Sequence, residues 1–299
     1  MQARTDNASV TIEQHDELPL LRVSNEHADA LIALQGGQLL EYTQRGQRPL
    51  IWLSERIAFK RGQTLRGGIP VCWPWFGDAQ RNPDAVRAQV RGDAPAHGLV
   101  RAADWSLLSV IDSAEGTEVA LRHTLRAHDH AAWPHAAELT LTIAVGRTLT
   151  LTLITRNLGS APLPITQALH TYFAISDIDR VEVEGLDGAT YIDTLDDWRE
   201  HTQHETLRFT GETDRIYLGT PAEISLRDAD WQRSIVLRTR NSQSAIVWNP
   251  WIEKTQRLSQ MADDGWRRML CIETANAARD SVAIAAGASH TLQLDIISA

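Results

Sequence analysis

The feature that most constrains the fold is a strict alternation of apolar and polar side chains near the middle of the chain. Every second residue is large and aliphatic from position 139 to 145, and the same alternation runs from 149 to 153 after Gly146 and Arg147. Successive side chains of a strand point to opposite faces of a sheet, so each run predicts a half-buried strand. The glycine-containing pair between the runs predicts a β-hairpin.

Similar short runs recur at close spacing along the rest of the chain. They cover residues 18–23, 30–34, 50–53, 105–111, 117–125, 180–183, 222–226, 233–239, 245–248, 281–285 and 290–297. Helical signals are confined to 53–59 and 253–261, each enough for a turn or two. No segment keeps a long 3.6-residue period, and no regular strand–helix alternation predicts a parallel sheet. We therefore expect an all-β protein, a β-sandwich of large antiparallel sheets with few short helices.

The composition predicts a globular protein with a large core. Of the 299 residues, 43% are hydrophobic and 22% are charged, and no linker or shift in composition marks a boundary. We therefore expect a single domain over residues 1–299. One long polar segment, residues 77–96, lies between two motifs discussed below, and a loop of that length in a compact domain is often functional.

Charge and cysteine usage limit the partners and the location. A net charge of −9 argues against nonspecific binding to nucleic acid or an anionic membrane, although a local basic pocket can still bind a small anion. Cys72 and Cys271 lie far apart, which predicts free thiols in a reducing compartment. Residues 1–10 lack the basic-then-apolar pattern of a secretory signal. We expect a cytoplasmic monomer that binds a small molecule, with no nucleic-acid or membrane partner.

The segment 65–77 is rich in residues that suit a ligand site. Its two adjacent glycines let the backbone approach a ligand closely, and Arg66 can grip an anion through two parallel hydrogen bonds. Trp73, Trp75 and Phe76 offer flat apolar walls of the kind that sugars stack on. The same residues also fit a buried strand with a glycine turn and a surface arginine, and composition alone does not separate the two interpretations.

Three further segments carry ionisable side chains in chemically suggestive places. His97 and Arg101 flank a glycine-containing turn, and His170 stands among apolar and aromatic residues. A lone histidine of this kind is more typical of a structural residue than of a catalyst. Glu273 lies between apolar neighbours, so it is either buried, and then hydrogen-bonded, paired or protonated, or turned to solvent by strand alternation.

Two other patterns predict packing rather than chemistry. Trp248 and Trp251 flank a turn at Asn249 and Pro250, which predicts core packing at the end of a strand. Four histidines, at positions 123, 128, 130 and 135, lie close in sequence. Because no cysteine joins them and their spacing fits no zinc pattern, we expect a polar loop between strands and no metal site.

Seven short blocks stand in order along the chain from about residue 20 to its end. They are Arg66-Gly67-Gly68-Ile69-Pro70, His97-Gly98, Arg101, His170-Thr171-Tyr172-Phe173, Thr213-Asp214-Arg215-Ile216-Tyr217, Trp248-Asn249-Pro250 and Cys271-Ile272-Glu273. Together they make the chain resemble the aldose 1-epimerase superfamily, and within it the glucose-6-phosphate 1-epimerase branch. The resemblance implies a supersandwich of the galactose-mutarotase type, an isomerase, and neither a metal nor an organic cofactor.

The resemblance also implies a role for individual residues. His170 matches the catalytic acid of the family and Glu273 its catalytic base. The implied substrate contacts are His97 for orienting the sugar, Arg66 and Arg101 for the phosphate, and Asp214 for sugar hydroxyls. Three departures leave the sugar preference open, because relatives often carry Gln, Asn and Pro at the positions of Ala96, Ala102 and Thr274.

The implied reaction, mutarotation, needs one acid and one base. The C1 hydroxyl loses a proton while the ring oxygen gains one, the ring opens, and it closes from the other face with the roles reversed. We expect the two groups on opposite sides of the O5–C1–O1 unit. Ordinary pKa values of ~4.3 for Glu and ~6.5 for His predict an ionised Glu273 and a partly protonated His170 near pH 7, with Asp177 or Asp214 able to favour the charged imidazole.

Three other functions fit parts of the sequence. An epimerase acting on free hexoses would use the same acid and base, and its arginines would be structural. A non-catalytic carbohydrate-binding sandwich would need neither His170 nor Glu273 and would expose its aromatic residues. A domain of a glycoside-processing enzyme would more usually call for paired carboxylates than for a His and a Glu.

Overall fold

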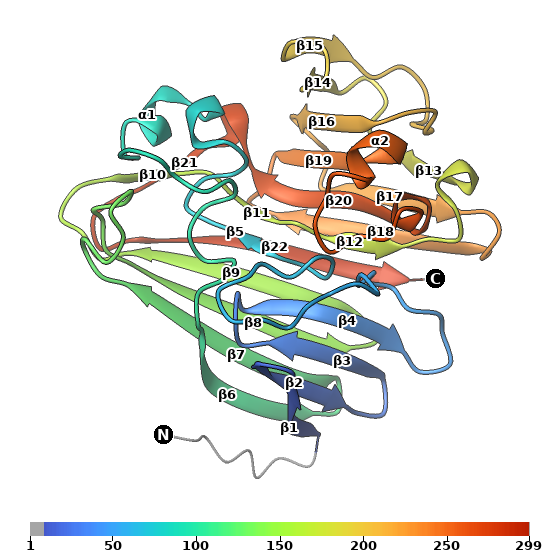
Figure 1. The fold of residues 1–299 in the computed structure, drawn as a ribbon, viewed down its shortest axis with the longest axis horizontal. Coiled ribbons are helices and arrows are strands. Elements are labelled where there is room, and N and C mark those ends of the chain that lie inside the picture. Colours follow the sequence, from blue (N-terminus) through green and yellow to red (C-terminus); the bar gives the residue numbers. More distant parts are fainter. Residues whose placement is uncertain (1–8, 299) are drawn as a thin grey trace.

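The computed structural model describes residues 9–298, which form a β-sandwich of large antiparallel sheets (Figure 1). The predicted hairpin is confirmed: β8 (Ala137–Gly146) and β9 (Leu149–Asn157) pair antiparallel on either side of a turn at Arg147 and Thr148. Residues 1–8 and 299 lie outside the described residues, and with them most of the segment that lacks a secretory pattern.

One eight-stranded sheet contains this hairpin, in the order β13-β17-β18-β22-β9-β8-β7-β6. Its other strands are β6 (Ser106–Ser113), β7 (Gly116–Leu125), β13 (Val181–Glu184), β17 (Glu223–Asp228), β18 (Arg233–Arg240) and β22 (Ser289–Ser298). Buried and half-exposed residues alternate along β8, so one face of this first sheet packs in the core and the other meets solvent.

A second eight-stranded sheet has the order β15-β14-β16-β19-β20-β11-β5, and β12 pairs with β20 beside β11. Its strands are β5 (Val71–Cys72), β11 (Gln167–Leu169), β12 (Tyr172–Ala174), β14 (Thr190–Asp193), β15 (Arg199–Thr202), β16 (Thr213–Leu218), β19 (Ser244–Asn249) and β20 (Met269–Asn276). Every residue of β19 and β20 is buried, so the middle of this second sheet is covered on both faces.

Smaller elements complete the fold. The four-stranded sheet consists of β1 (Val10–His15), β2 (Leu18–Ser24), β3 (Ala28–Ala33) and β4 (Gln38–Gln44), and β10 (Leu163–Ile165) pairs with β21 (Val282–Ile284). The helices are α1 (Asp84–Arg87), α2 (Trp251–Thr255) and 3₁₀ turns at Ala79–Arg81, Ile178–Arg180, Gly265–Arg268 and Ala278–Asp280. Among the described residues, no helix has the length and apolar character needed to cross a membrane.

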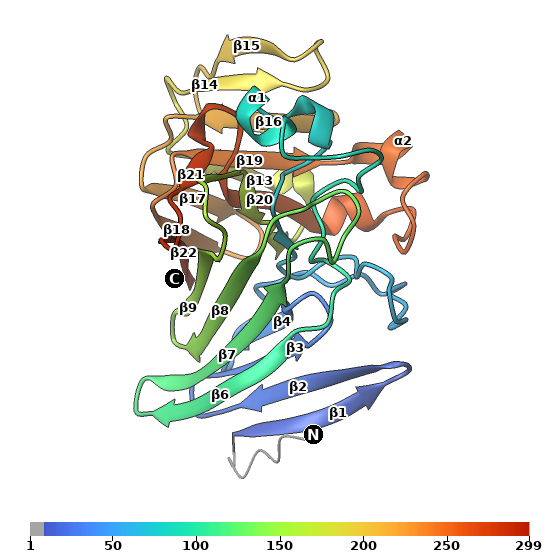
Figure 2. The same cartoon turned by 90° about the vertical axis from the view of Figure 1, so that its left-hand side faces the viewer.

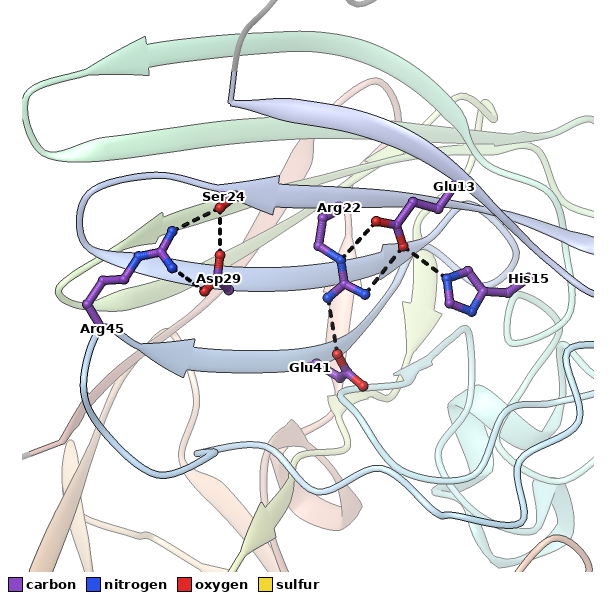
Figure 3. A network of polar contacts seen from close by, with 7 residues as sticks. All are labelled: Glu13, His15, Arg22, Ser24, Asp29, Glu41 and Arg45. Atoms are coloured by element: carbon purple, nitrogen blue, oxygen red, sulfur yellow. Dashed lines mark hydrogen bonds and ion pairs between the residues drawn. The ribbon is translucent and has the colours of Figure 1, made fainter.

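The main core lies between the first sheet on one side and the second sheet and the four-stranded sheet on the other. It joins Leu151 of β9 to Ile32 of β3 and to Val247 and Ile272 of β19 and β20. The four-stranded sheet lies at the end of the molecule opposite β14 and β15 (Figure 2). One of its faces carries a network of charged side chains, in which Arg22 bonds both Glu13 and Glu41 (Figure 3).

A separate apolar cluster covers the opposite face of the second sheet. On β20, Leu270 and Ile272 enter the main core, whereas Cys271 and Ala275 belong to this second cluster. The alternation of a strand therefore places Glu273 on the same face as Cys271. We call this the site face, because the candidate catalytic residues lie on it.

Some predicted elements differ from the structure. Residues 50–53 form isolated bridges instead of a strand, with Ile51 opposite Phe173 and Leu53 opposite Gly67. The segment 53–59 has no helix, and the helical signal at 253–261 corresponds to α2 alone, which ends at Thr255. The polar segment 77–96 contains a 3₁₀ turn and α1, whose Val86 is fully buried.

Candidate active site

Glu273 lies at the centre of the site face and is only 1% exposed. It belongs to β20, between β19 on one side and β11 and β12 on the other, and faces Ile246 across the ladder. Of the two orientations that the sequence left open, the structure shows the buried one. A carboxylate in such a place needs a partner, because burying an unpaired charge is costly.

His170 supplies that partner. It stands in the short gap between β11 and β12, where its N–H donates to the carbonyl of Pro70 at 2.9 Å. Its imidazole Nε2 lies 3.3 Å from Oε1 of Glu273, and its side chain is 8% exposed. The structure therefore brings together two residues that are 103 positions apart in sequence.

Each member of the pair also keeps an unsatisfied polar atom. Oε2 of Glu273 and Nδ1 of His170 are buried, and neither has a hydrogen-bond partner among the described residues. Buried polar groups are nearly always hydrogen-bonded, so each of these two atoms has the capacity to bond a ligand. Nε of Arg101 is orphaned in the same way.

Burial opposes the charge on both members of the pair. It raises the pKa of Glu273 well above 4.5, with Asp214 raising it further and Arg101 opposing. It lowers the pKa of His170 well below 6.5, and the charges of Arg101 and Arg66 act in the same direction. The protonation states expected from ordinary pKa values, an ionised Glu273 and a partly protonated His170, are therefore disfavoured by this environment.

Neither Asp177 nor Asp214, the residues expected to favour a charged His170, is the carboxylate in contact with it, which is Glu273. Asp177 is bound to Arg267, with Oδ2 2.9 Å from Nε of the guanidinium. Asp214 acts on the pKa of Glu273, and no effect of Asp214 on His170 is resolved. The carboxylate in contact with His170 is therefore the residue that the resemblance assigns as the base.

His97 lies beside the pair and is held in a defined tautomer. Its ring is 5.5 Å from that of His170 and 5.0 Å from that of Phe76. Nδ1 accepts a hydrogen bond from the N–H of Gly77 at 3.3 Å and lies 3.4 Å from Sγ of Cys72. Burial lowers the pKa of His97 to about 3, so the ring is neutral and its proton is on Nε2, available as a donor.

Arg66 is positioned by the two glycines that follow it. A Cβ on Gly67 would lie 2.6 Å from the carbonyl oxygen of Trp52, and one on Gly68 would lie 2.3 Å from that of Leu39. Only glycine allows the chain to pass this close to two neighbouring segments with positive φ angles of 107° and 69°. The pair of glycines therefore allows the backbone to pack closely against two neighbouring segments.

The two arginines differ in their surroundings. Arg66 donates from Nη1 to the hydroxyl of Tyr172 at 3.4 Å and from Nε to the carbonyl of Ser259 at 3.3 Å. The charge of Arg101 acts on His97, His170 and Glu273, so it lies close to the pair. Among residues 9–298, neither arginine forms an ion pair with a carboxylate.

Asp214 lies two strands from Glu273 and has a lysine partner. It faces Trp248 across the β16–β19 ladder, and Nζ of Lys254, on α2, is 3.6 Å from its carboxylate and 3.0 Å from that of Glu212. Burial raises the pKa of Asp214 and the charge of Lys254 lowers it. Lys254 was not identified from the sequence, although its place one helical turn beyond the Trp248 block could have pointed to it.

The aromatic residues are arranged differently from the prediction. Trp73 and Trp75, expected as sugar-stacking walls, are 0% exposed and pack in the main core, so that expectation is wrong. Trp248, expected only to pack, lies edge-on to His170 with ring centroids 6.1 Å apart. Tyr172, to which the sequence gave no role, stacks directly on His170 at 4.9 Å.

The clustered histidines and a cavity lined by arginines lie outside this site. Among the described residues, no group of three or more His, Cys, Asp or Glu side chains is placed to hold a metal ion, the four clustered histidines included. A cavity of about 790 Å³ is lined by Arg180, Arg208 and Arg227, away from the catalytic pair. These three arginines are paired with Asp230, Glu182 and Glu184. Arg233 also lines the cavity, and its guanidinium donates to the carbonyls of Pro49 and Ala174.

Comparison with known proteins assigns the fold first. The chain superposes on a galactose mutarotase-like protein from Lactobacillus casei with a TM-score of 0.72 and 16% sequence identity, over 94% of this chain and all of the other. The sandwich is therefore a galactose-mutarotase-like fold, as the sequence predicted. The family follows from the sequence itself: the aldose 1-epimerase model matches residues 19–296, so the chain belongs to that family and is an epimerase, an enzyme of the isomerase class.

Two relatives are more similar. A protein of Escherichia coli named "Putative glucose-6-phosphate 1-epimerase" is 34% identical over 263 residues, covering 88% of this chain and 84% of the relative. The crystal structure of a protein from Salmonella typhimurium described as a "putative mutarotase (YeaD)" superposes with a TM-score of 0.89 and 30% identity, covering 99% of this chain and 95% of the other.

Proposed function

We propose that the protein interconverts the α and β anomers of a hexose 6-phosphate, with D-glucose 6-phosphate as the first candidate. The observation that carries the proposal is the buried contact between His170 and Glu273, whose orphaned atoms leave each group able to bond a substrate. The name of the E. coli relative supports the choice of sugar.

In the proposed reaction Glu273 removes the proton of the C1 hydroxyl and His170 protonates the ring oxygen. The ring opens to the aldehyde, the C1–C2 bond rotates, and closure returns both protons with the roles reversed. In the structure the two groups are neighbours, with Nε2 of His170 3.3 Å from Oε1 of Glu273. A neighbouring pair still suffices, because O1 and O5 are both bonded to C1, and a direct contact lets the pair reset its proton after each turnover.

The phosphate would be bound by Arg66 and Arg101. Both carry a positive charge that no carboxylate neutralises within the described chain, and both act electrostatically on His170. A phosphate dianion would supply the missing counter-charge and would accept directional hydrogen bonds from each guanidinium. It would also offset the two cations beside His170, which favours the protonated imidazole that the reaction needs.

Neutral parts of the sugar have their own partners in the proposed complex. The Nε2 proton of His97 can be donated to a sugar oxygen, since Nδ1 is already an acceptor. Asp214 accepts from sugar hydroxyls while Lys254 keeps its carboxylate ionised. Trp248 offers an apolar ring next to His170.

The test is anomer exchange measured by NMR on equilibrated glucose 6-phosphate, with free glucose and free galactose in parallel. Faster exchange on the phosphorylated sugar alone supports the proposal. Equal acceleration on all three sugars would assign an epimerase of free aldoses. No acceleration on any sugar would leave a binding protein that has the fold and lacks the reaction.

The arginines are tested by separating KM from kcat. Arg66→Gln is the sharper variant, because Arg101 also acts on Glu273 whereas no effect of Arg66 on Glu273 is resolved. Losing a charged hydrogen bond typically costs ~1.5–3 kcal/mol, so KM for glucose 6-phosphate should rise about 10- to 100-fold. Turnover of free glucose should change far less; an equal loss on both sugars would make the arginine structural or catalytic.

A further inference from the structure

Tyr172 connects the two ends of the proposed site. It begins β12, where its N–H donates to the carbonyl of Gly68 and its own carbonyl accepts from the N–H of Trp52, both at 2.9 Å. Its side chain is fully buried, with 1% of the residue exposed. The backbone of Tyr172 is thus tied to the glycine pair that positions Arg66, and its side chain lies on the site face.

The ring of Tyr172 packs face to face against the imidazole of His170. The centroids are 4.9 Å apart and the planes differ by 11°. The opposite neighbour in the stack is Trp52, at 5.9 Å and 24°, and Trp248 meets the phenol edge-on at 6.0 Å. A ring held by three neighbours presents a rigid surface, so the imidazole resting on it has a defined plane, with Nε2 directed toward Glu273.

The hydroxyl of Tyr172 addresses a different residue. It accepts a hydrogen bond from Nη1 of Arg66 at 3.4 Å, and Nε of the same guanidinium donates to the carbonyl of Ser259. A phenylalanine would fill the same space and stack equally well. A buried tyrosine hydroxyl usually has a hydrogen-bond partner, and here that partner is Arg66 of the proposed phosphate site.

We propose that Tyr172 is the positioning residue of this site: its ring orients the catalytic imidazole and its hydroxyl orients Arg66 toward the substrate phosphate. The second half rests on the proposed function; the first half does not. The consequence is that binding at the phosphate end and the geometry of the acid are connected through a single side chain.

Two substitutions separate the two halves. Tyr172→Phe removes only the hydroxyl, and we expect the ratio of kcat/KM for glucose 6-phosphate to that for glucose to fall about 2- to 10-fold through KM. The same variant should weaken competitive inhibition by inorganic phosphate by a similar factor. Tyr172→Leu removes the stack, and we expect kcat to fall about 10-fold or more on both sugars.

The chain contains a matched control. Tyr191 stacks on His201 at 5.5 Å and 28° with the guanidinium of Arg215 4.5 Å from its ring centre, in the same sheet but away from the catalytic pair. Tyr191→Phe and Tyr191→Leu should leave both kinetic constants unchanged. If they act like the Tyr172 variants, the effect is on the sheet as a whole and the proposal is wrong.

A measurement without substrate tests the orienting role of Tyr172 separately from the proposed reaction. The pH titration of His170, followed by NMR of histidine-labelled protein, reports on the groups facing the imidazole, which are Glu273, His97, Arg66 and Arg101. Tyr172→Leu should shift that titration and Tyr191→Leu should not. This result supports the ring half even if wild type shows no preference for the phosphorylated sugar, which would refute only the proposed substrate.

Two outcomes would overturn the assignment. A loss of kcat above about 100-fold on both sugars in Tyr172→Phe is the size expected of a general acid or base, and would mean that the hydroxyl itself transfers a proton. An unchanged His170 titration and unchanged kcat in Tyr172→Leu, with the variant folded by circular dichroism, would mean that the ring positions nothing.

Discussion

Strands β8 and β20 are interior strands of the two eight-stranded sheets, and their side chains differ in how they are buried. Along β8, buried residues alternate with half-exposed ones, and the half-exposed residues include Thr140 and Thr142. Along β20 all residues are buried, including the charged Glu273 and the polar Thr274 and Asn276.

The difference lies in what covers the outer face. The threonines of β8 are partly exposed, so their hydroxyl groups can reach solvent. The outer face of β20 is covered by an apolar cluster that includes Trp52, Tyr172 and Trp248. A carboxylate on that face stays only because it has a partner and a use, so the same strand periodicity supports stability in one sheet and chemistry in the other.

The sharpest test of this contrast replaces one glutamate by glutamine in each sheet. Glu273→Gln removes the proposed base and should lower the rate of anomer exchange about 10²–10⁴-fold, the usual contribution of a general acid or base. Glu138→Gln, on β8, removes a half-exposed carboxylate 3.9 Å from Arg122 and should leave the rate unchanged. NMR exchange at equal concentrations of folded protein measures both; full activity in Glu273→Gln would refute the assignment of the base.

Core substitution in the first sheet should have the opposite signature. Leu151→Ala removes a fully buried side chain of β9 from the main core and should reduce the free energy of unfolding by about 2–5 kcal/mol. Denaturant unfolding measures the loss. The kcat of the remaining folded protein should be that of wild type, and a reduced kcat would show that the two sheets are coupled.

Glu273 should also cost stability at neutral pH. Its folded pKa is raised well above 4.5, so above that pH the unfolded chain has lost a proton that the folded chain retains, and stability falls as pH rises. Glu273→Gln carries no such proton. The difference in stability between the variant and wild type should therefore shift in favour of the variant as pH rises above about 4.5. Thermal unfolding across this range checks it, and a constant difference would contradict it.

The smallest effect is expected at the charged network of the four-stranded sheet (Figure 3). Arg22 bonds Glu13 at 3.2 Å and Glu41 at 3.3 Å, with all three side chains partly exposed. Arg22→Gln should cost at most about 1 kcal/mol, less at high salt, and should not change activity. Unfolding at two salt concentrations tests this, and a large loss would show that charge alone supports this sheet.

The architecture followed from periodicity because periodicity is local. The run at 139–153 predicted β8, β9 and their turn, and the many similar runs predicted a sandwich of antiparallel sheets. The short strands β5, β11 and β12 were not predicted as strands, since a segment of two or three residues has no period to detect. Residues 50–53 look like a strand and form only isolated bridges, because their neighbours decide their pairing.

The candidate site was predictable as a set of residues and not as an arrangement. The ordered blocks pointed to the family, and the family model confirms that reading. Periodicity could not show whether Glu273 faces solvent, nor that Trp73 and Trp75 lie in the core while Trp248 borders the site. His170 and Tyr172 are two positions apart, which is the spacing of residues on one face of a strand. Only the structure shows that their rings stack, with centroids 4.9 Å apart.

The sequence by itself therefore determined the all-β class, the central hairpin and the identity of the residues that carry the family resemblance, since each depends on neighbouring positions or on their order. Tertiary structure alone decided that His170 and Glu273 touch, that both are shifted toward neutrality, and that Tyr172 lies between the acid and Arg66. The reason is that burial and long-range contact set the electrostatic environment of an ionisable group, and both depend on which distant segments the sheets bring together.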